Sequence, residues 1–553
     1  MPLRNIVVQG IVLSEIAAGT TSIEELAHRL QRYIALKAEE STGLVASAID
    51  ALTDREICIS DGSEVVLVND STVLLSDSPA PRLAKAIVDR LMVREQYDVK
   101  PEIHAALERI AEEVIVVRGF DLGAEFASSR FLTDLDPSNT IRKAIDRHLP
   151  QYWQHRKSQI AAAFLDLLRR PTSAEEELLA EVGRISFGIE MVLQAGRATM
   201  YASSLPEVVY LDASVLMPAI VDGHPYQHAY IGALAKLQSA AEVEGSSTVV
   251  MIADVFLNEI VTHRKRAIEM IAELGLESYE TLNRRIQYYG ADNVNVFVGA
   301  YSTWVSRRRG GTFQEFLQAE APYNTEDELA TFLKGKGIKV AATGPKSQSD
   351  VQTYEFVKTR LFDGYERAEF GWSEPERKAV VLKRHEAAQL AILLSTSQRG
   401  RRAVLVTADK LLRRVAAGLG IRELRDTLIS HRNLVQMVDL LVGAPVDSSS
   451  LARLLWTVRV ADERAAIKDY LISRALPQYD AALSLKMSDL LDRIVDRVTH
   501  EAKLEGVKLG ASSFVERTKE MRFIDRIEGE VFAQLAEEVR KLKQELKRKE
   551  QSS

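Results

Sequence analysis

The chain contains a single cysteine, Cys58, among its 553 residues. One thiol cannot form an intramolecular disulfide, and it cannot supply a cysteine-rich zinc site. The sequence therefore excludes both devices as sources of stability. A chain so poor in cysteine is typical of a reducing compartment, and we expect a cytoplasmic protein.

Long apolar runs are also missing. No stretch approaches the roughly 18 uninterrupted apolar residues that a membrane helix needs. The apolar patch near the start of the chain is interrupted by Glu15 and continues with helical periodicity, so a signal peptide is not expected. We predict a protein that does not interact with membranes.

The chain has no excess of positive charge. It carries 71 basic and 78 acidic residues, a formal net charge of -7. No global field attracts it to nucleic acid, so any such binding has to use local basic patches. The length predicts several domains, and the share of hydrophobic residues, 46%, is ordinary for a globular chain that buries its apolar residues.

Residues 1–78 show a recognisable order of elements. Three helical patterns come first: residues 5–18, a helix that begins with the capping-box pair Ser22 and Glu25, and residues 42–54. A hairpin signal, Asp61-Gly62, follows them. This order resembles a winged helix-turn-helix. Its third helix, "TGLVASAIDALTD", has no lysine or arginine to contact phosphates or base edges. We therefore favour protein docking or dimerisation for this domain, with a DNA-binding regulator as the alternative.

The remaining chain divides by its pattern into three parts. Residues 82–203 read as a helical connector, 204–445 alternate strands with helices, and 446–553 are helical again. The tail carries an apolar stripe with helical spacing: Val531, Leu535, Val539, Leu542 and Leu546. Such a stripe predicts a coiled coil, and so self-association or a protein partner, or a helix packed on its own chain.

Acidic residues mark the part that alternates strands with helices. Asp212 follows the apolar strand pattern "VVYL", and Asp409 follows "AVLV" and Thr407. Glu259 and Glu386 lie on helices predicted to flank these strands. Ligands gather beyond the carboxyl ends of parallel strands, and four carboxylates there would repel one another unless a cation joined them. Oxygen ligands without cysteine favour Mg²⁺ or Mn²⁺ over zinc.

The stretches "YLDASVLM", "LNEIV", "RHEAAQLA" and "VLVTADKLLRRVA" are similar to the PIN-domain nucleases. The resemblance implies an α/β PIN-like fold, a parallel sheet flanked by helices, over about residues 208–442. It also implies a metal-dependent nuclease that hydrolyses RNA, less often DNA. The residues that it implies as metal ligands and catalytic groups are Asp212, Glu259, Glu386 and Asp409, with Ser214 and Thr407 in support.

Three departures from the family pattern matter. Ala213 stands where a hydroxyl residue is common, and Glu386 stands where aspartate is common. The long interval between Glu259 and Glu386 implies an insertion at about residues 275–375, in which "NTEDELATFLKGKGIKVAATGPKSQSD" looks like a loop. A catalytically inactive PIN-like scaffold is therefore the alternative to an enzyme.

Basic residues of the same part are candidates for contacting substrate phosphates. They are His263, Arg264, Arg266, Arg307, Arg308 and Arg402. Runs of charged residues are more often solvated surfaces, which is the alternative for each of these. The aromatic residues Tyr288, Tyr289, Tyr301 and Trp304 are expected either to stack on unpaired bases or to form core. The substrate we expect is single-stranded or structured RNA.

Overall fold

The structure is a computed structural model of the 553-residue chain. It describes residues 3–17, 19–33, 38–54, 57–61, 63–68, 79–95, 100–128, 137–169, 171–193, 205–243, 246–274, 276, 282, 294–308, 310–345, 347–371, 377–425, 427–442, 448–456, 481–507, 509, 519–527, 529–531, 533–534, 537, 540–541 and 544. Over these residues the protein is mostly helical, with a parallel sheet of five strands and a two-stranded hairpin.

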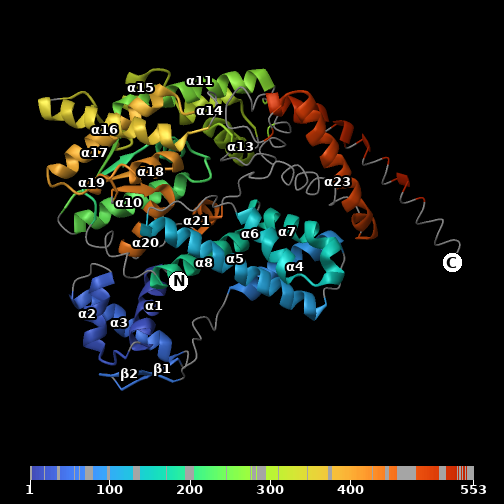
Figure 1. Cartoon of the computed structure of the whole chain (residues 1–553), viewed down its shortest axis with the longest axis horizontal. Coiled ribbons are helices and arrows are strands. Elements are labelled where there is room, and N and C mark those ends of the chain that lie inside the picture. The colour runs from blue at the N-terminus through green and yellow to red at the C-terminus, as the bar shows by residue number, and fades with distance from the viewer. Residues whose placement is uncertain are drawn as a thin grey trace.

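The amino-terminal elements follow the expected order, three helices and then a hairpin (Figure 1). They are α1 (Leu3–Ala17), α2 (Ile23–Tyr33), α3 (Ala38–Thr53), β1 (Cys58–Ser60) and β2 (Val65–Leu67). The Asp61 carboxylate shapes the hairpin turn, because its Oδ1 accepts the backbone N–H groups of Ser63 and Glu64 at 3.0 and 2.8 Å. Acidic residues, Glu39 and Glu40, occupy the first turn of α3.

A helical region follows this unit, as the sequence predicts. Its elements are α4 (Ala80–Glu95), α5 (Pro101–Ser128), α6 (Pro137–His148), the 3₁₀ turn η1 (Gln151–Arg156), α7 (Lys157–Arg169) and α8 (Ser173–Leu193). The Arg90 guanidinium joins α4 to α7 and α8, because it contacts the carboxylates of Asp166 at 2.5 Å and Glu175 at 2.6 Å. Helix α8 also packs against α21 (Ser448–Leu455). The connector, which precedes the sheet region in the chain, therefore contacts a helix that follows it.

The five parallel strands are β3 (Val208–Leu211), β4 (Val249–Ala253), β5 (Lys339–Ala341), β6 (Ala403–Thr407) and β7 (Leu428–Ser430). Their order across the sheet is β5-β4-β3-β6-β7. The chain first moves outward from β3 through β4 to β5, and then crosses to the other side of β3 to form β6 and β7. The strand order therefore reverses between β3 and β6, which is where open α/β sheets bind their ligands.

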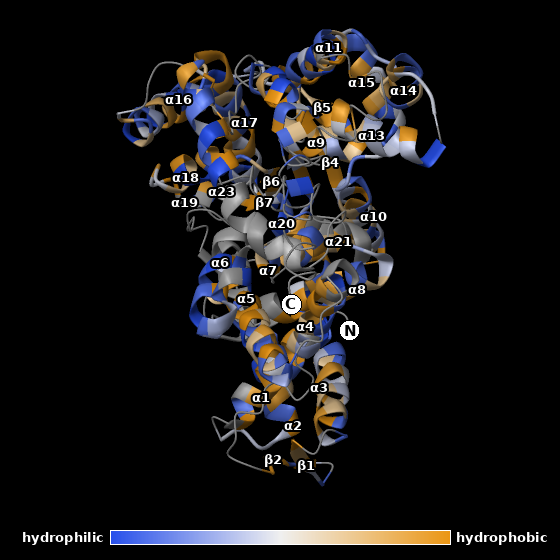
Figure 2. Cartoon of the chain, turned by 90° about the vertical axis from the view of Figure 1, so that its right-hand side faces the viewer, coloured by the Kyte–Doolittle hydropathy of each residue, from blue (hydrophilic) through white to orange (hydrophobic). Residues whose placement is uncertain are grey.

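Helices cover both faces of this sheet. Alternate residues of β3 point into two separate cores. Val209 and Leu211 belong to the first core, and Val208 and Tyr210 belong to the second. The first face is covered by α9 (Ala213–Ile220), α10 (Gln227–Val243), α11 (Leu257–Leu274) and α20 (His431–Val442). The second is covered by α16 (Gln348–Ala368), α17 (Val380–Gln398), α18 (Lys410–Ala417) and α19 (Arg422–Arg425). Figure 2 shows hydrophilic and hydrophobic residues mixed along these helices, as expected for amphipathic layers.

The prediction of a loop around residues 324–350 is wrong, because this stretch contains a helix and a strand. Helix α15 (Glu326–Gly335) begins at Thr325, whose side chain accepts the Glu328 N–H, and β5 follows as the edge strand beside β4. Leu329 and Leu333 are buried, so α15 has the apolar side that a loop lacks. Helices α13 (Val296–Arg308) and α14 (Phe313–Glu320) lie earlier in the same expected insertion.

The carboxy-terminal part contains α23 (Ala481–Leu504). Of the apolar stripe predicted in the tail, Val531 is buried, and the other four side chains lie outside the described residues. Among the described helices, none has a stretch long and apolar enough to cross a membrane.

Candidate functional site

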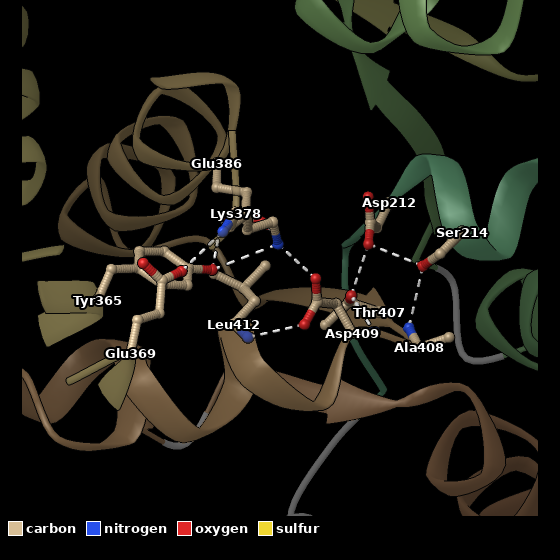
Figure 3. Close-up of polar contacts among 10 residues, drawn as sticks. All are labelled: Asp212, Ser214, Tyr365, Glu369, Lys378, Glu386, Thr407, Ala408, Asp409 and Leu412. Atoms are coloured by element: carbon tan, nitrogen blue, oxygen red, sulfur yellow. Dashed lines mark hydrogen bonds and ion pairs between the residues drawn. The ribbon is translucent and has the colours of Figure 1, made fainter. Parts of the chain in front are cut away.

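Asp212 lies directly after β3 and is the N-cap residue of α9. The residue is buried, with 7% of its surface exposed. Two hydroxyls hold its carboxylate (Figure 3): Ser214 Oγ donates to Oδ2 at 2.8 Å, and Thr407 Oγ1 donates to the same oxygen at 2.6 Å. Hydroxyl support for Asp212 therefore comes from Ser214 and Thr407, although Ala213 itself has no hydroxyl.

Asp409 follows the neighbouring strand β6 and is the N-cap residue of α18. Its Oδ1 accepts the Leu412 N–H at 2.8 Å, and its own N–H donates to Thr407 Oγ1 at 3.0 Å. The Ala408 N–H donates to Ser214 Oγ at 3.1 Å. Hydrogen bonds thus join the ends of β3 and β6 and bring two of the four predicted acids to the same edge of the sheet.

Glu386 approaches this edge from α17 and is buried. Tyr365 of α16 donates its hydroxyl to Glu386 Oε2 at 2.7 Å. The ammonium of Lys378 contacts both Glu386 Oε1 and Asp409 Oδ2, so Glu386 lies one side chain away from Asp409 (Figure 3). The Lys378 ammonium therefore bridges Glu386 and Asp409.

Glu259 lies in the first turn of α11 and is close enough to interact electrostatically with Asp212 and Asp409. Burial raises its pKa to about 7, and the negative charge of Asp212 adds to that effect. Burial also raises the pKa of Asp212, and the charge of Asp409 adds to it, although the bonds from Thr407 and Ser214 oppose it. Burial is the main cause of both shifts, and the neighbouring carboxylates add to it.

Lys378 was not predicted from the sequence, and neither was its support. It lies just before α17, and 13% of its side chain is exposed. Burial disfavours its charged form, but attraction to Asp409 and Glu386 outweighs burial and holds the pKa of Lys378 above its ordinary value. The buried Glu369 accepts the Lys378 backbone N–H at 3.0 Å through Oε1 and the Lys383 ammonium at 2.6 Å through Oε2.

Two of the predicted substrate contacts do not lie open at this edge. Arg264 is buried, and its guanidinium donates to Ala321 O at 2.9 Å and to Asn324 Oδ1 at 2.8 Å. Arg402 precedes β6 and lies 3.4 Å from Glu207, which precedes β3. Both strands are parallel, so Arg402 is at the edge of the sheet opposite Asp212. We therefore exclude Arg264 and Arg402 from the residues that we expect to contact substrate.

The other basic candidates have different surroundings. Arg266 is exposed, and its charge acts to lower the pKa of Glu259, so it lies near the acidic site. Burial, aided by the charge of Arg266, lowers the pKa of His263. Arg307 lies 3.8 Å from Asp222, and the Arg308 guanidinium lies 4.4 Å from the centre of the Trp304 ring. Arg266 is therefore the arginine among these candidates whose position is tied to the acids.

The aromatic residues near these arginines belong to the core where they are described. Tyr301 and Trp304 are buried and pack against Phe313 and Phe316. This is the core arrangement that the sequence allowed as an alternative to base stacking. Tyr288 and Tyr289 lie outside the described residues.

The donor set fits a hard divalent cation in its chemistry, because carboxylate oxygens with raised pKa values are drawn together without cysteine or a histidine pair. In the described part of the chain, however, no three acidic, histidine or cysteine side chains are arranged so that they hold a metal ion directly. The Lys378 ammonium stands between Glu386 and Asp409 and marks the position where these two acids share a cation.

Comparison of the chain with protein-family models, curated proteins and solved structures found no match.

Proposed function

We propose that the protein is a metal-dependent nuclease that hydrolyses RNA phosphodiester bonds with Mg²⁺ or Mn²⁺. The observation that supports this proposal is the meeting of Asp212 and Asp409 at the reversal point of a parallel sheet. Loops beyond the carboxyl ends of such strands form a crevice for ligands. Two acids from adjacent strand ends and a third from α17 bring carboxylates together at this point, with the Lys378 ammonium between two of them.

Each residue has a role in this proposal. Asp212, Glu259, Glu386 and Asp409 would hold the cation through carboxylate oxygens. Ser214 and Thr407 fix the rotamer of Asp212, and the Leu412 N–H fixes that of Asp409. When bound, a divalent cation supplies an electrophile that lowers the pKa of water and offsets negative charge on the phosphate oxygens. Arg266 is placed to attract the phosphate backbone of the substrate.

The RNA substrate comes from the resemblance in the sequence, so the test has to include DNA. We would incubate the protein with end-labelled RNA and DNA pools, with and without Mn²⁺, and map the product ends. We expect Mn²⁺-dependent RNA cleavage that falls at least about 100-fold in Asp212→Asn and in Asp409→Asn, since each change removes a full ligand charge. Glu355→Gln, a change at an exposed acid on α16, is the control. Cleavage unaffected by both aspartate changes would refute the assignment.

A second function is favoured by one observation, the Lys378 contact with Glu386 and Asp409. A site whose acids are already bridged by an ammonium suits an inactive scaffold that uses its fold for protein docking. Titration calorimetry with Mn²⁺ separates the two proposals when it includes a variant without Lys378. A scaffold is expected to bind no Mn²⁺ while Lys378 is present.

A further inference from the structure

Lys378 engages one carboxylate oxygen of Glu386 and one of Asp409. We propose that Lys378 is a built-in competitor for the metal site: its ammonium has to leave Glu386 and Asp409 before a divalent cation binds there. The inference rests on the proposed function, and it adds regulation of the same site. In this state the site is closed, and it opens when Lys378 withdraws.

The pattern of donors at each carboxylate carries the argument. One oxygen of three of the four acids is held by neutral donors: Asp212 Oδ2 by two hydroxyls, Asp409 Oδ1 by the Leu412 N–H, and Glu386 Oε2 by the Tyr365 hydroxyl. The second oxygens of Asp409 and Glu386 both contact Lys378 Nζ. Neutral donors orient a carboxylate without cancelling its charge. Asp212 and Asp409 are thus oriented by groups other than Lys378, whereas the Tyr365 hydroxyl that orients Glu386 also accepts from Lys378 Nζ at 3.4 Å.

The position of Lys378 is itself held by a buried device. Glu369 is fully enclosed, with 2% of its surface exposed, and it uses both oxygens on this segment. One accepts the Lys378 backbone N–H, and the other accepts the Lys383 ammonium. The carboxylate thereby ties the backbone of Lys378 to the first turns of α17. This anchor fixes the backbone from which the ammonium extends toward the acids. A chance contact between a surface lysine and the acids would not require a buried anchor.

The chemistry of the two cations explains why the competition is exclusive. An ammonium and a divalent ion both require the same oxygens, and two cations within a few ångströms repel each other. A lysine carries one charge on a long stem, so it can be displaced by an ion of higher charge. Removing Lys378 leaves Glu386 and Asp409 facing each other without a counter-charge. The site then gains affinity for any small divalent cation.

The test is a comparison of Mn²⁺ binding by the full chain and its variants, by electron paramagnetic resonance of free Mn²⁺ and by calorimetry. The variant is Lys378→Met, which keeps the length of the side chain and removes its charge. The control is Lys358→Met on α16, which removes the same charge from a pair with the exposed Glu355. We expect Lys378→Met to bind Mn²⁺ at least about tenfold more tightly than the wild type, and Lys358→Met to match the wild type.

The outcomes separate this inference from the proposed function. Equal affinity of wild type and Lys378→Met, or weaker binding by the variant, overturns the competitor role and leaves a metal site in place. Absence of binding by both proteins overturns the metal site, and the inference falls with it. Binding by both proteins that is at least about tenfold tighter in Lys378→Met supports both the metal site and the competition, whereas binding by the variant alone overturns displacement of Lys378 in the wild type.

A measurement on the wild type covers the case in which the variant does not fold. Trace acetylation of lysines, read by mass spectrometry of peptides, reports how accessible each ammonium is. We expect the acetylation rate of Lys378 to rise several-fold in saturating Mg²⁺, while that of Lys358 stays constant. An unchanged rate at Lys378 under saturation would overturn the proposal.

Discussion

Glu259→Gln is the change whose effect on stability follows most directly from the structure. The pKa of Glu259 is raised to about 7 from an ordinary value of 4.5. The folded protein therefore binds this proton more tightly than the unfolded chain does. The contribution of the protonated group to stability is complete below pH 4.5, and it is lost as the pH rises to about 7.

The size of this loss follows from the same two values. A tenfold change in proton affinity corresponds to about 1.36 kcal/mol, so the gap between 4.5 and about 7 corresponds to about 3 kcal/mol as an upper bound. Glutamine has nearly the same shape and is neutral at every pH. Without metal, the variant should therefore be more stable than the wild type by up to about 3 kcal/mol at pH 8, and equal to it at pH 4.5.

Urea unfolding in the presence of a chelator measures this difference at the two pH values. Glu269→Gln, at an exposed position of the same helix, is the matched control and should leave the transition unchanged at both. Saturating Mn²⁺ should reverse the order, because the wild type has the additional ligand charge and is stabilised more by binding. A gain in Glu259→Gln that is the same at pH 4.5 and pH 8 would refute the electrostatic reasoning.

Two further changes test the supporting contacts. Thr407→Val removes the hydroxyl that donates to Asp212 at 2.6 Å and should destabilise the protein by about 2 to 4 kcal/mol, because a hydrogen bond to a charged group is lost in a buried place. Denaturation in guanidinium measures it, and a loss below about 0.5 kcal/mol would contradict the assigned role. Lys383→Met leaves the buried carboxylate of Glu369 without its ion pair and should cost about 3 to 5 kcal/mol at pH 7. Thermal unfolding at pH 7 tests this, and equal stability of variant and wild type would exclude the assigned pairing.

The strand ends of the site were predictable from local sequence, and the cation between the acids was not. An apolar strand pattern followed at once by an acid or a hydroxyl marks Asp212 and Thr407, because strand and ligand are neighbours in the chain. Lys378 lies just before α17, and Tyr365 lies in the last turn of α16. No spacing rule connects them to Glu386, because their meeting depends on how α16 and α17 pack.

Two other differences between prediction and structure have readable causes. The β5 strand is a three-residue edge strand beside a glycine-containing turn, so its composition resembles a loop while its partner β4 supplies the pairing. Arg264 lies within a run of basic residues, yet it follows Ile260 by four positions and precedes Ala267 by three. That helical spacing places Arg264 on the buried side of α11. The spacing is the sequence signal that distinguishes Arg264 from Arg266.

The apolar core on one face of the sheet does not stop at the sheet. It continues through α20 and α10 into α8 and α1, so side chains from the first helix of the protein and from β3 belong to one continuous interior. A shortened protein that begins at residue 205 would lose the helices that cover this core and would expose apolar side chains to water. Severing the polypeptide between its apparent parts should therefore produce aggregates, and biochemical study of the acidic site calls for the intact molecule.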